Sequence, residues 1–268
     1  MLVPRRGTPP SGAHVISLPN LGRNSLLFLH GDDGPLAAQP FVDALRAGAE
    51  APVAEVVAPT CPGWSEEPIP VWLRSVDQLA YHYLDALDRS ATAPVIAIGA
   101  SIGAWLLLEM ATKQPQVFSA LVLISPVGVK ITDRETAQFT DLFAHDIDDR
   151  ASALYADPET ALRRLALLDD HEILGLAVAQ EAVARFGWEP YLYNPLLRHR
   201  LHRVKCPTAI FHGADDGFVA SLDYYRRLAA LFGGPTRLMT VDGAGHRVEE
   251  EQPTALARSV LEFLRDVR

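Results

Sequence analysis

Three residues of this chain have the types and the order needed for nucleophilic catalysis: one serine, one aspartate and one histidine. Ser101 is the centre of Gly99–Gly103 (Gly-Ala-Ser-Ile-Gly), which lies between an apolar run and a stretch with helical periodicity. A serine with glycines two positions away on both sides, at a strand-to-helix junction, is typical of a nucleophile elbow, a turn that exposes the hydroxyl. The helix that follows would direct its N-terminal N–H groups at the same place. We therefore predict that Ser101 is a nucleophile.

A serine hydroxyl needs a base, and the base needs an acid that orients it. One predicted strand is followed by a turn with two acids, Asp215 and Asp216, and the last predicted strand is followed by a glycine-rich loop that ends in His246. The order serine, aspartate, histidine is one in which such triads occur along a chain. Each residue also has a structural alternative, because Ser101 could be a helix N-cap and the others could be ordinary turn and loop residues.

These residues must be positioned by the elements around them. Short runs rich in Val, Ile and Leu alternate with longer stretches of helical periodicity, and most of the runs are apolar throughout, as in parallel strands covered on both faces. The predicted strands are His14–Leu18, Ser25–Leu29, Val53–Ala58, Pro94–Ile98, Ala120–Ile124, Thr208–Phe211 and Arg237–Val241. The predicted helices between and after them are Phe41–Ala49, Trp72–Asp88, Ser101–Lys113, Leu222–Phe232 and Pro253–Val267. This repeated pattern predicts an α/β fold with a mainly parallel sheet.

One long stretch, 126–204, contains no convincing strand. Its periodicity predicts three helices, Asp133–Phe143, Pro158–Leu168 and Glu172–Phe186. Ligands bind at the carboxyl ends of the strands in open α/β sheets, and a helical insert between two strands would cover that edge. We therefore predict a core formed by 1–125 and 205–268 with a helical cap at 126–204. The alternative is a structural excursion that only covers apolar surface.

Several motifs together resemble the α/β-hydrolase superfamily, and they span nearly the whole chain. They are Ser25–Gly31 with its His-Gly turn, the loop Ala58–Ser65, the elbow, Asp216–Val219, Gly245-His246 and Glu251–Pro253. The chain resembles in particular the branch with a serine nucleophile and a helical cap, which includes small esterases and carbon–carbon bond hydrolases. This resemblance implies a mainly parallel, eight-stranded sheet flanked by helices. The family's acid motif, Gly-x-x-Asp with an apolar residue three positions on, points to Asp216 rather than Asp215.

The resemblance also implies an oxyanion hole formed by the backbone N–H groups of Ile102 and Asp32. Two neighbouring carboxylates, Asp32 and Asp33, would place negative charge beside that hole. We expect them to point away and to cap a helix that starts near Pro35 or Leu36. A carboxylate that pointed inward would weaken the hole or bind a cationic substrate group. His30 is expected to hold its turn by hydrogen bonds.

Three functions are compatible with these residues. The first is a serine hydrolase that cleaves an ester, thioester or lactone of a small, largely apolar molecule. The second is a carbon–carbon bond hydrolase of ring-fission diketones, with Arg185 facing the substrate carboxylate; its relatives have tryptophan where this chain has Arg247. The third is a non-hydrolytic, ligand-binding or ring-forming protein, which the acids beside the hole favour. A serine nucleophile argues against the haloalkane and epoxide hydrolases, which use aspartate.

Bulky side chains near the cap are candidates for the substrate pocket. The candidates are Trp105, Phe143, Arg185, Trp188 and Tyr191. Aromatic side chains could line an apolar acyl or ring pocket. The alternative is that they are core residues or attach the cap to the core.

Composition limits the partners of the protein. Acidic residues outnumber basic ones, 33 to 24, for a formal charge of −9, and no basic tract is present, so we expect no nucleic acid or anionic membrane partner. Cys61 and Cys206 have no metal-like spacing, and a reducing compartment is a simpler interpretation than a disulfide. With no signal peptide, membrane span, metal motif or nucleotide motif, we expect a cytoplasmic, cofactor-free monomer or homodimer acting on a small molecule.

Overall fold

A computed structural model describes residues 16, 18–22, 25–48, 55–65, 67, 69–133 and 135–267. Within them, six parallel strands form one sheet in the order β2-β1-β3-β4-β5-β6. The strands are β1 (Ser25–Leu29), β2 (Glu55–Val57), β3 (Val95–Ala100), β4 (Phe118–Ile124), β5 (Thr208–Gly213) and β6 (Thr236–Val241). Each corresponds to a predicted strand. The eight strands implied by the family resemblance are not all found, since the chain has only seven suitable apolar runs, and most of His14–Leu18 lies outside the described residues.

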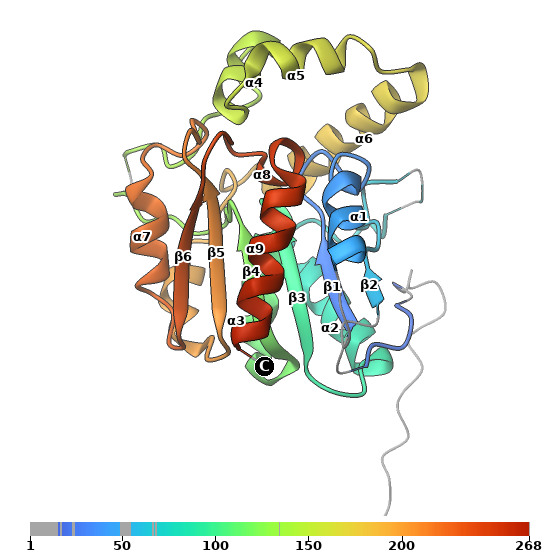
Figure 1. Cartoon of the computed structure of the whole chain (residues 1–268), viewed down its shortest axis with the longest axis vertical. Helices are drawn as coiled ribbons and strands as arrows, with labels where there is room; N and C mark the ends of the chain where they lie inside the picture. The colour runs from blue at the N-terminus through green and yellow to red at the C-terminus, as the bar shows by residue number, and fades with distance from the viewer. Residues whose placement is uncertain are drawn as a thin grey trace, which may run out of the picture.

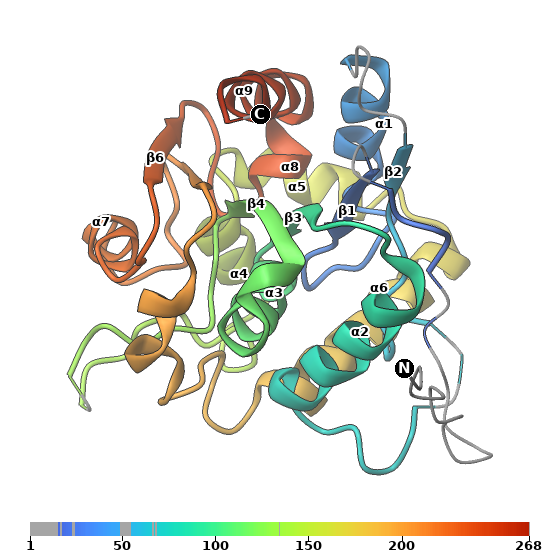
Figure 2. The ribbon, with the colours of Figure 1, turned by 90° about the horizontal axis from the view of Figure 1, so that it is seen from below.

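Helices cover both faces of the sheet (Figure 2). On one face lie α1 (Gln39–Gly48) and α9 (Pro253–Asp266), and on the other α2 (Val76–Ser90) and α3 (Ile102–Lys113). The apolar side chains form two separate core clusters, one on each side of the sheet. This burial explains why β3, and β1 apart from Ser25, carry no polar side chains, since neither of their faces is exposed to water.

Several other elements are short or lie near the sheet's edges and ends. They are η1 (Pro115–Val117), η2 (Leu197–His199), η3 (Leu201–Arg203), α7 (Asp223–Ala229) and α8 (Val248–Glu251). In the described part of the chain, no helix is both long and apolar enough to cross a lipid bilayer. Cys61 and Cys206 form no disulfide.

Three helices lie between β4 and β5: α4 (Ile147–Leu154), α5 (Pro158–Leu165) and α6 (Asp170–Gly187). Their starts are encoded locally, because an aspartate at each N-cap accepts hydrogen bonds from the first turn, and in α6 Asp169 and Glu172 form a complete capping box. The helices α5 and α6 match their predictions closely.

The predicted helix Asp133–Phe143 is wrong, since the described residues of that range form a loop. The Asp133 carboxylate accepts hydrogen bonds from the N–H groups of Glu135 and Thr136, as at a helix N-cap, but no helix follows. The backbone pairs instead with the loop after β5: the Thr140 N–H donates to the Phe218 carbonyl at 2.9 Å, and the Ala220 N–H donates to the Gln138 carbonyl at 3.0 Å. Gln138 ties the loop further by accepting from the Ile131 N–H at 3.0 Å.

The α4–α6 segment lies over one end of the sheet (Figure 1). The loop that follows β6 lies at this end, where the Leu154 carbonyl at the end of α4 accepts from the Arg247 N–H at 3.2 Å. The Glu251 carboxylate adds a clamp, accepting from the Ala156 N–H at 2.9 Å and from the Gly245 N–H at 2.7 Å. The helices are thus attached directly to the loop that carries His246.

Candidate active site

The nucleophile elbow is a strained turn between β3 and α3. Ser101 has φ 45° and ψ −110°, which is unusual for a residue other than glycine, and its N–H donates to the Ile124 carbonyl at 2.9 Å. A Cβ atom at Gly103 would lie 2.3 Å from the Leu29 carbonyl oxygen, and one at Gly99 would lie 2.7 Å from backbone atoms of α3. Both flanking glycines are therefore required by close backbone contact. Ser101 occupies the N-cap position of α3, but its side chain makes no capping hydrogen bond.

The serine, histidine and aspartate form one continuous hydrogen-bonded chain. Ser101 Oγ lies 3.0 Å from His246 Nε2, and His246 Nδ1 lies 3.0 Å from Asp216 Oδ2. All three side chains are buried. An ionised carboxylate can only accept hydrogen bonds, so the imidazole carries its proton on Nδ1 and presents Nε2 as an acceptor to the serine. This is the arrangement in which a histidine can remove a serine proton.

The Asp216 carboxylate is held by neighbours on both oxygens. Oδ1 accepts from the Phe218 N–H at 2.9 Å, and Oδ2 accepts from the Tyr225 hydroxyl at 2.6 Å. Burial opposes the charged form, but the charge of His246 and these hydrogen bonds outweigh it and lower the pKa of Asp216. Asp215 is exposed and does not face the histidine. Tyr225 was not predicted, because no motif distinguishes it from other apolar-face residues of α7.

Asp32 does not cap a helix as predicted. Its carboxylate forms a two-point ion pair with Arg247, with Oδ1 and Oδ2 each 2.7 Å from a guanidinium nitrogen. Asp33 Oδ2 lies 2.9 Å from the same guanidinium, and α1 begins only at Gln39. Both carboxylates thus form ion pairs with a buried arginine, the residue after His246. No pattern in the sequence connects this arginine with Asp32 or Asp33.

Arg247, Asp32, Asp33, Glu249 and Glu250 form what we call the Arg247 cluster. Burial opposes the charges of Asp32 and Arg247, but their mutual attraction lowers the pKa of Asp32 and raises that of Arg247. Burial raises the pKa of Glu249 to about 7 and that of Glu250 to about 8, against the attraction of Arg247. Four carboxyl groups share one guanidinium, so some of them hold protons at neutral pH.

His30 holds the turn after β1, as predicted. Its Nδ1 lies 2.8 Å from the Gly31 carbonyl oxygen, and its Nε2 accepts from the Cys61 N–H at 2.9 Å. Burial lowers the pKa of His30 to about 4, so the ring is neutral at physiological pH. Trp64, in the loop that His30 anchors, donates from Nε1 to the Asp32 carbonyl at 2.7 Å. The backbone at Asp32 is therefore fixed from a second side.

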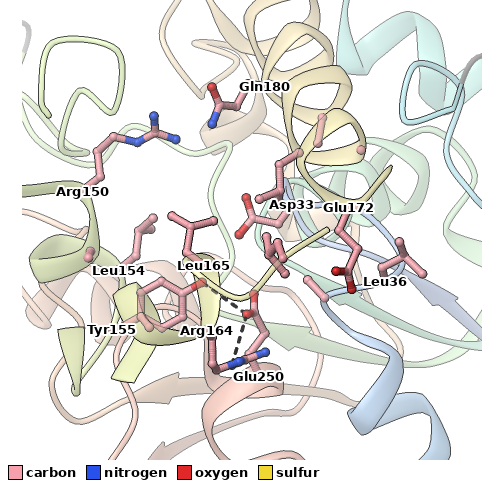
Figure 3. Close-up of a pocket in the computed structure, with 18 of the residues that line it drawn as sticks. Asp33, Leu36, Arg150, Leu154, Tyr155, Arg164, Leu165, Glu172, Gln180 and Glu250 are labelled. Atoms are coloured by element: carbon pink, nitrogen blue, oxygen red, sulfur yellow. Dashed lines mark hydrogen bonds and ion pairs between the residues drawn. The ribbon is translucent and has the colours of Figure 1, made fainter. Parts of the chain in front are cut away.

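A cavity of about 320 Å³ lies beside this site, between the α4–α6 segment and the loop that follows β1. Its walls are mostly apolar, and include Leu36, Leu154, Leu162, Leu165, Leu168 and Leu176. Figure 3 shows Tyr155, Arg164 and Glu250 joined at one side of it, with Asp33 projecting between the walls and Arg150 beyond. Neither Ser101 nor His246 is among its lining residues. Asp33, which does line it, lies in the loop after β1, and the carbonyl of Leu154 accepts from the Arg247 N–H in the loop that carries His246.

The five predicted pocket residues do not line this cavity. Trp105 is buried in the core and donates from Nε1 to Glu109 at 3.2 Å. Arg185 pairs with Glu181 on its own helix at 3.5 Å. The other three form an aromatic group that joins the loop before α4 to the end of α6: Phe143, Trp188 and Tyr191. The apolar wall of this cavity comes mostly from leucines of the α4–α6 segment. A role of the five residues in substrate binding stays a prediction.

The cavity residues could not be recognised by type, since leucines at helical spacing are also what a helix packed on a core requires. Among the described residues, no group of three or more His, Cys, Asp or Glu side chains is placed to hold a metal ion.

Comparison with known proteins agrees with the fold. The family model described as the alpha/beta hydrolase family matches residues 26–259. The chain therefore belongs to the alpha/beta hydrolase family.

Individual relatives are more distant. Protein NDL1 of Arabidopsis thaliana is 25% identical over 228 residues, which are 77% of this chain and 60% of that protein. The chain thus spans about 60% of the length of this curated relative. A thermophilic esterase from Thermogutta terrifontis matches with a TM-score of 0.69 at 18% identity, covering 93% of this chain and 92% of that one. A meta-cleavage product hydrolase from Pseudomonas fluorescens gives 0.69 at 18% identity, covering 93% of both chains. At such identities the likeness concerns the fold.

Proposed function

We propose that the protein is a serine hydrolase that cleaves an ester, thioester or lactone of a small, largely apolar molecule. The observation that carries this proposal is the hydrogen-bonded chain from Ser101 Oγ through His246 to Asp216. A serine hydroxyl in contact with a correctly oriented imidazole is activated for attack on a carbonyl carbon. The strained backbone at Ser101 supports the same role, because such strain persists where the surrounding structure holds a residue for function.

The reaction proceeds through an acyl-enzyme. Ser101 Oγ attacks the carbonyl carbon as its proton passes to His246 Nε2, and the N–H groups of Ile102 and Asp32 stabilise the negative oxygen of the tetrahedral intermediate. His246 then protonates the departing oxygen or sulfur. A water molecule, deprotonated by His246, attacks the acyl carbon and frees the serine. Asp216 holds the imidazole orientation throughout.

The cavity between the α4–α6 segment and the loop after β1 is proposed to hold the apolar part of the substrate. Its volume of about 320 Å³ is at the small end of the range for ligand pockets. Its leucine walls favour an alkyl or ring group over a charged one. We therefore propose esters with short to medium acyl chains as substrates, and the α4–α6 segment as a cap over the site. A cytoplasmic location and a monomeric or homodimeric state remain predictions.

The test compares wild type with Ser101→Ala on p-nitrophenyl acetate and butyrate. We expect the variant to lose at least about 1,000-fold in kcat/KM. Ser152→Ala is the matched control, because Ser152 is exposed on α4 and bonds only to its own helix; it should behave like wild type. A fluorophosphonate probe should label wild type and Ser152→Ala but not Ser101→Ala. Equal hydrolysis by wild type and Ser101→Ala would refute the proposal.

A carbon–carbon bond hydrolase with the same triad is the second candidate. It needs an arginine near the substrate carboxylate, and the arginines that line the cavity are Arg150 and Arg164 rather than the predicted Arg185. Since Arg164 lies 3.9 Å from Glu250, Arg150 is the better candidate. This function predicts turnover of vinylogous diketo acids, with a raised KM in Arg150→Gln. Ester hydrolysis without any diketo acid turnover would exclude it.

The observation that favoured the non-hydrolytic alternative no longer supports it. It rested on two acids beside the oxyanion hole, and the structure pairs both with Arg247. Failure of the fluorophosphonate probe to label Ser101 would restore it.

A further inference from the structure

Arg247 is the most deeply buried large side chain of the protein that carries a charge. It is 1% exposed, although arginine is among the residues least often buried. It directly follows His246 in the chain, and through Asp32 it reaches the turn that follows His30 and Gly31. The two loops that flank the reacting carbonyl in the proposed mechanism are thus joined by one ion pair.

The geometry of this pair is that of a rigid clamp. Two parallel contacts of 2.7 Å between a planar guanidinium and a planar carboxylate fix both distance and orientation. The Asp32 backbone is held at the same time by Trp64, which donates to its carbonyl. The peptide that carries the Asp32 N–H is held on its other side, because its carbonyl oxygen, that of Gly31, lies 2.8 Å from His30 Nδ1. With the side chain and both neighbouring peptides held, the Asp32 N–H has little freedom to turn away from an oxyanion.

The pair also solves an electrostatic problem. A carboxylate on the residue that supplies an oxyanion-hole N–H would repel the negative charge that forms there. Burial strengthens that repulsion, because water no longer screens it. The guanidinium neutralises Asp32 where it stands, and it also lies 2.9 Å from Asp33. An aspartate can then occupy this position without weakening the hole.

We propose that Arg247 is a positioning residue of the hydrolytic reaction, which holds the Asp32 backbone N–H in place and cancels the Asp32 charge while the oxyanion forms. This inference rests on the proposed function. It assigns a role to the residue at which the chain departs from the carbon–carbon bond hydrolases that it resembles. It also predicts that Arg247 and Asp32 act as a unit, so that removal of the arginine harms the enzyme mainly by leaving the carboxylate uncompensated.

The test is a double-mutant cycle with Arg247→Met, Asp32→Asn and the double variant, assayed on p-nitrophenyl butyrate. Rates are expressed per molecule titrated by the fluorophosphonate probe, so that unfolded protein does not count. We expect Arg247→Met to lower kcat about 100-fold with KM changed less than about threefold, as for loss of an oxyanion-hole contact. The double variant should recover at least about tenfold in kcat over Arg247→Met. A purely structural role would lower the titrated fraction and leave kcat per titrated site unchanged.

Arg247→Lys is the second variant, for the case in which Arg247→Met does not fold. Lysine keeps the charge but cannot make the two-point contact, so kcat should fall about tenfold. The matched control is Arg237→Met, which breaks an exposed ion pair with Asp266 and should leave kcat unchanged. Wild-type kcat in Arg247→Met or Arg247→Lys, or no recovery in the double variant, overturns the inference. If wild type itself neither hydrolyses esters nor takes up the probe, the proposed function has failed, and this inference fails with it.

Discussion

Replacement of Glu250 by glutamine should stabilise the protein at alkaline pH. The Glu250 side chain is 5% exposed, and its Oε1 has no hydrogen-bond partner within the described structure. The nearest cations, Arg164 and Arg247, are both 3.9 Å away, which is too far for a strong hydrogen bond. Burial raises the pKa of this carboxyl to about 8, against the attraction of Arg247. The folded protein therefore favours the protonated form, whereas the unfolded chain ionises Glu250 near its ordinary value of 4.5.

The sign and size of the effect follow from proton binding. Between pH 4.5 and about 8 the folded state holds a proton that the unfolded state has lost, so the free energy of unfolding falls as the pH rises. Each pH unit removes about 1.4 kcal/mol, or about 5 kcal/mol over the interval as an upper bound. The titration of Glu250 is coupled to that of Asp33 and Glu249, so part of this loss of stability arises from those two carboxyls. We expect Glu250→Gln to exceed wild type in stability by about 2–3 kcal/mol at pH 9, and by much less at pH 5.

The assay is urea unfolding of both proteins at pH 5, 7 and 9, followed by circular dichroism. Glutamine has nearly the size and shape of glutamate, so packing against Tyr155 is preserved. Glu181→Gln is the control, because this glutamate is exposed on α6 and should show no pH-dependent difference from wild type. If the stability difference between Glu250→Gln and wild type did not grow with pH, the buried carboxyl would not be protonated as argued here.

Three further substitutions test the site. Gly103→Ala should reduce kcat by at least about 100-fold or prevent folding, because its Cβ would lie 2.3 Å from the Leu29 carbonyl oxygen; ester hydrolysis and thermal unfolding measure the two effects. Tyr225→Phe should lower kcat about three- to tenfold with little change in KM, since it removes the 2.6 Å hydrogen bond to Asp216; steady-state kinetics decide, and an unchanged kcat would contradict this role. Gly175→Leu should lower kcat/KM for p-nitrophenyl octanoate but not for the acetate, because Gly175 lines the cavity and a Cβ there meets nothing within 4 Å; equal loss on both esters would show that the cavity does not hold the acyl chain.

The central sheet and the elbow were predictable because their signals are local. The apolar runs that became β1 and β3 are buried on both faces, and the glycines around Ser101 are required by backbone contacts within a few ångströms. The placement of Asp216 and His246 follows from strand order, since parallel strands bring the loops at their carboxyl ends together. Once the fold is predicted, the approach of Asp216 and His246 to Ser101 can therefore be predicted from it.

The surroundings of the triad could not be predicted in the same way. Arg247 and Asp32 are 215 positions apart, and nothing in either local pattern indicates that a surface-type residue will be buried. The loop at 133–143 was predicted as a helix from its periodicity. Its backbone pairs instead with the loop after β5, where the Thr140 N–H donates to the Phe218 carbonyl, and nothing in the local pattern indicates that contact. The aromatic residues near α6 were assigned to a pocket by type, but they do not line the cavity, whose apolar wall is mostly leucine.

The three successive glutamates of the segment from His246 to Glu251 each have a different structural role. In a sequence, three successive glutamates suggest a solvated face, but here each carboxyl has a separate place. Glu249 is buried in the Arg247 cluster, Glu250 accepts from Tyr155 at 3.2 Å beside the cavity, and Glu251 clamps the α4–α5 connection to the histidine loop. One stretch thus joins the proposed base, the oxyanion turn and the helices over the site. A change in the α4–α6 segment would therefore reach the loop that carries His246 through the Glu251 carboxylate and through the hydrogen bond from the Arg247 N–H to the Leu154 carbonyl.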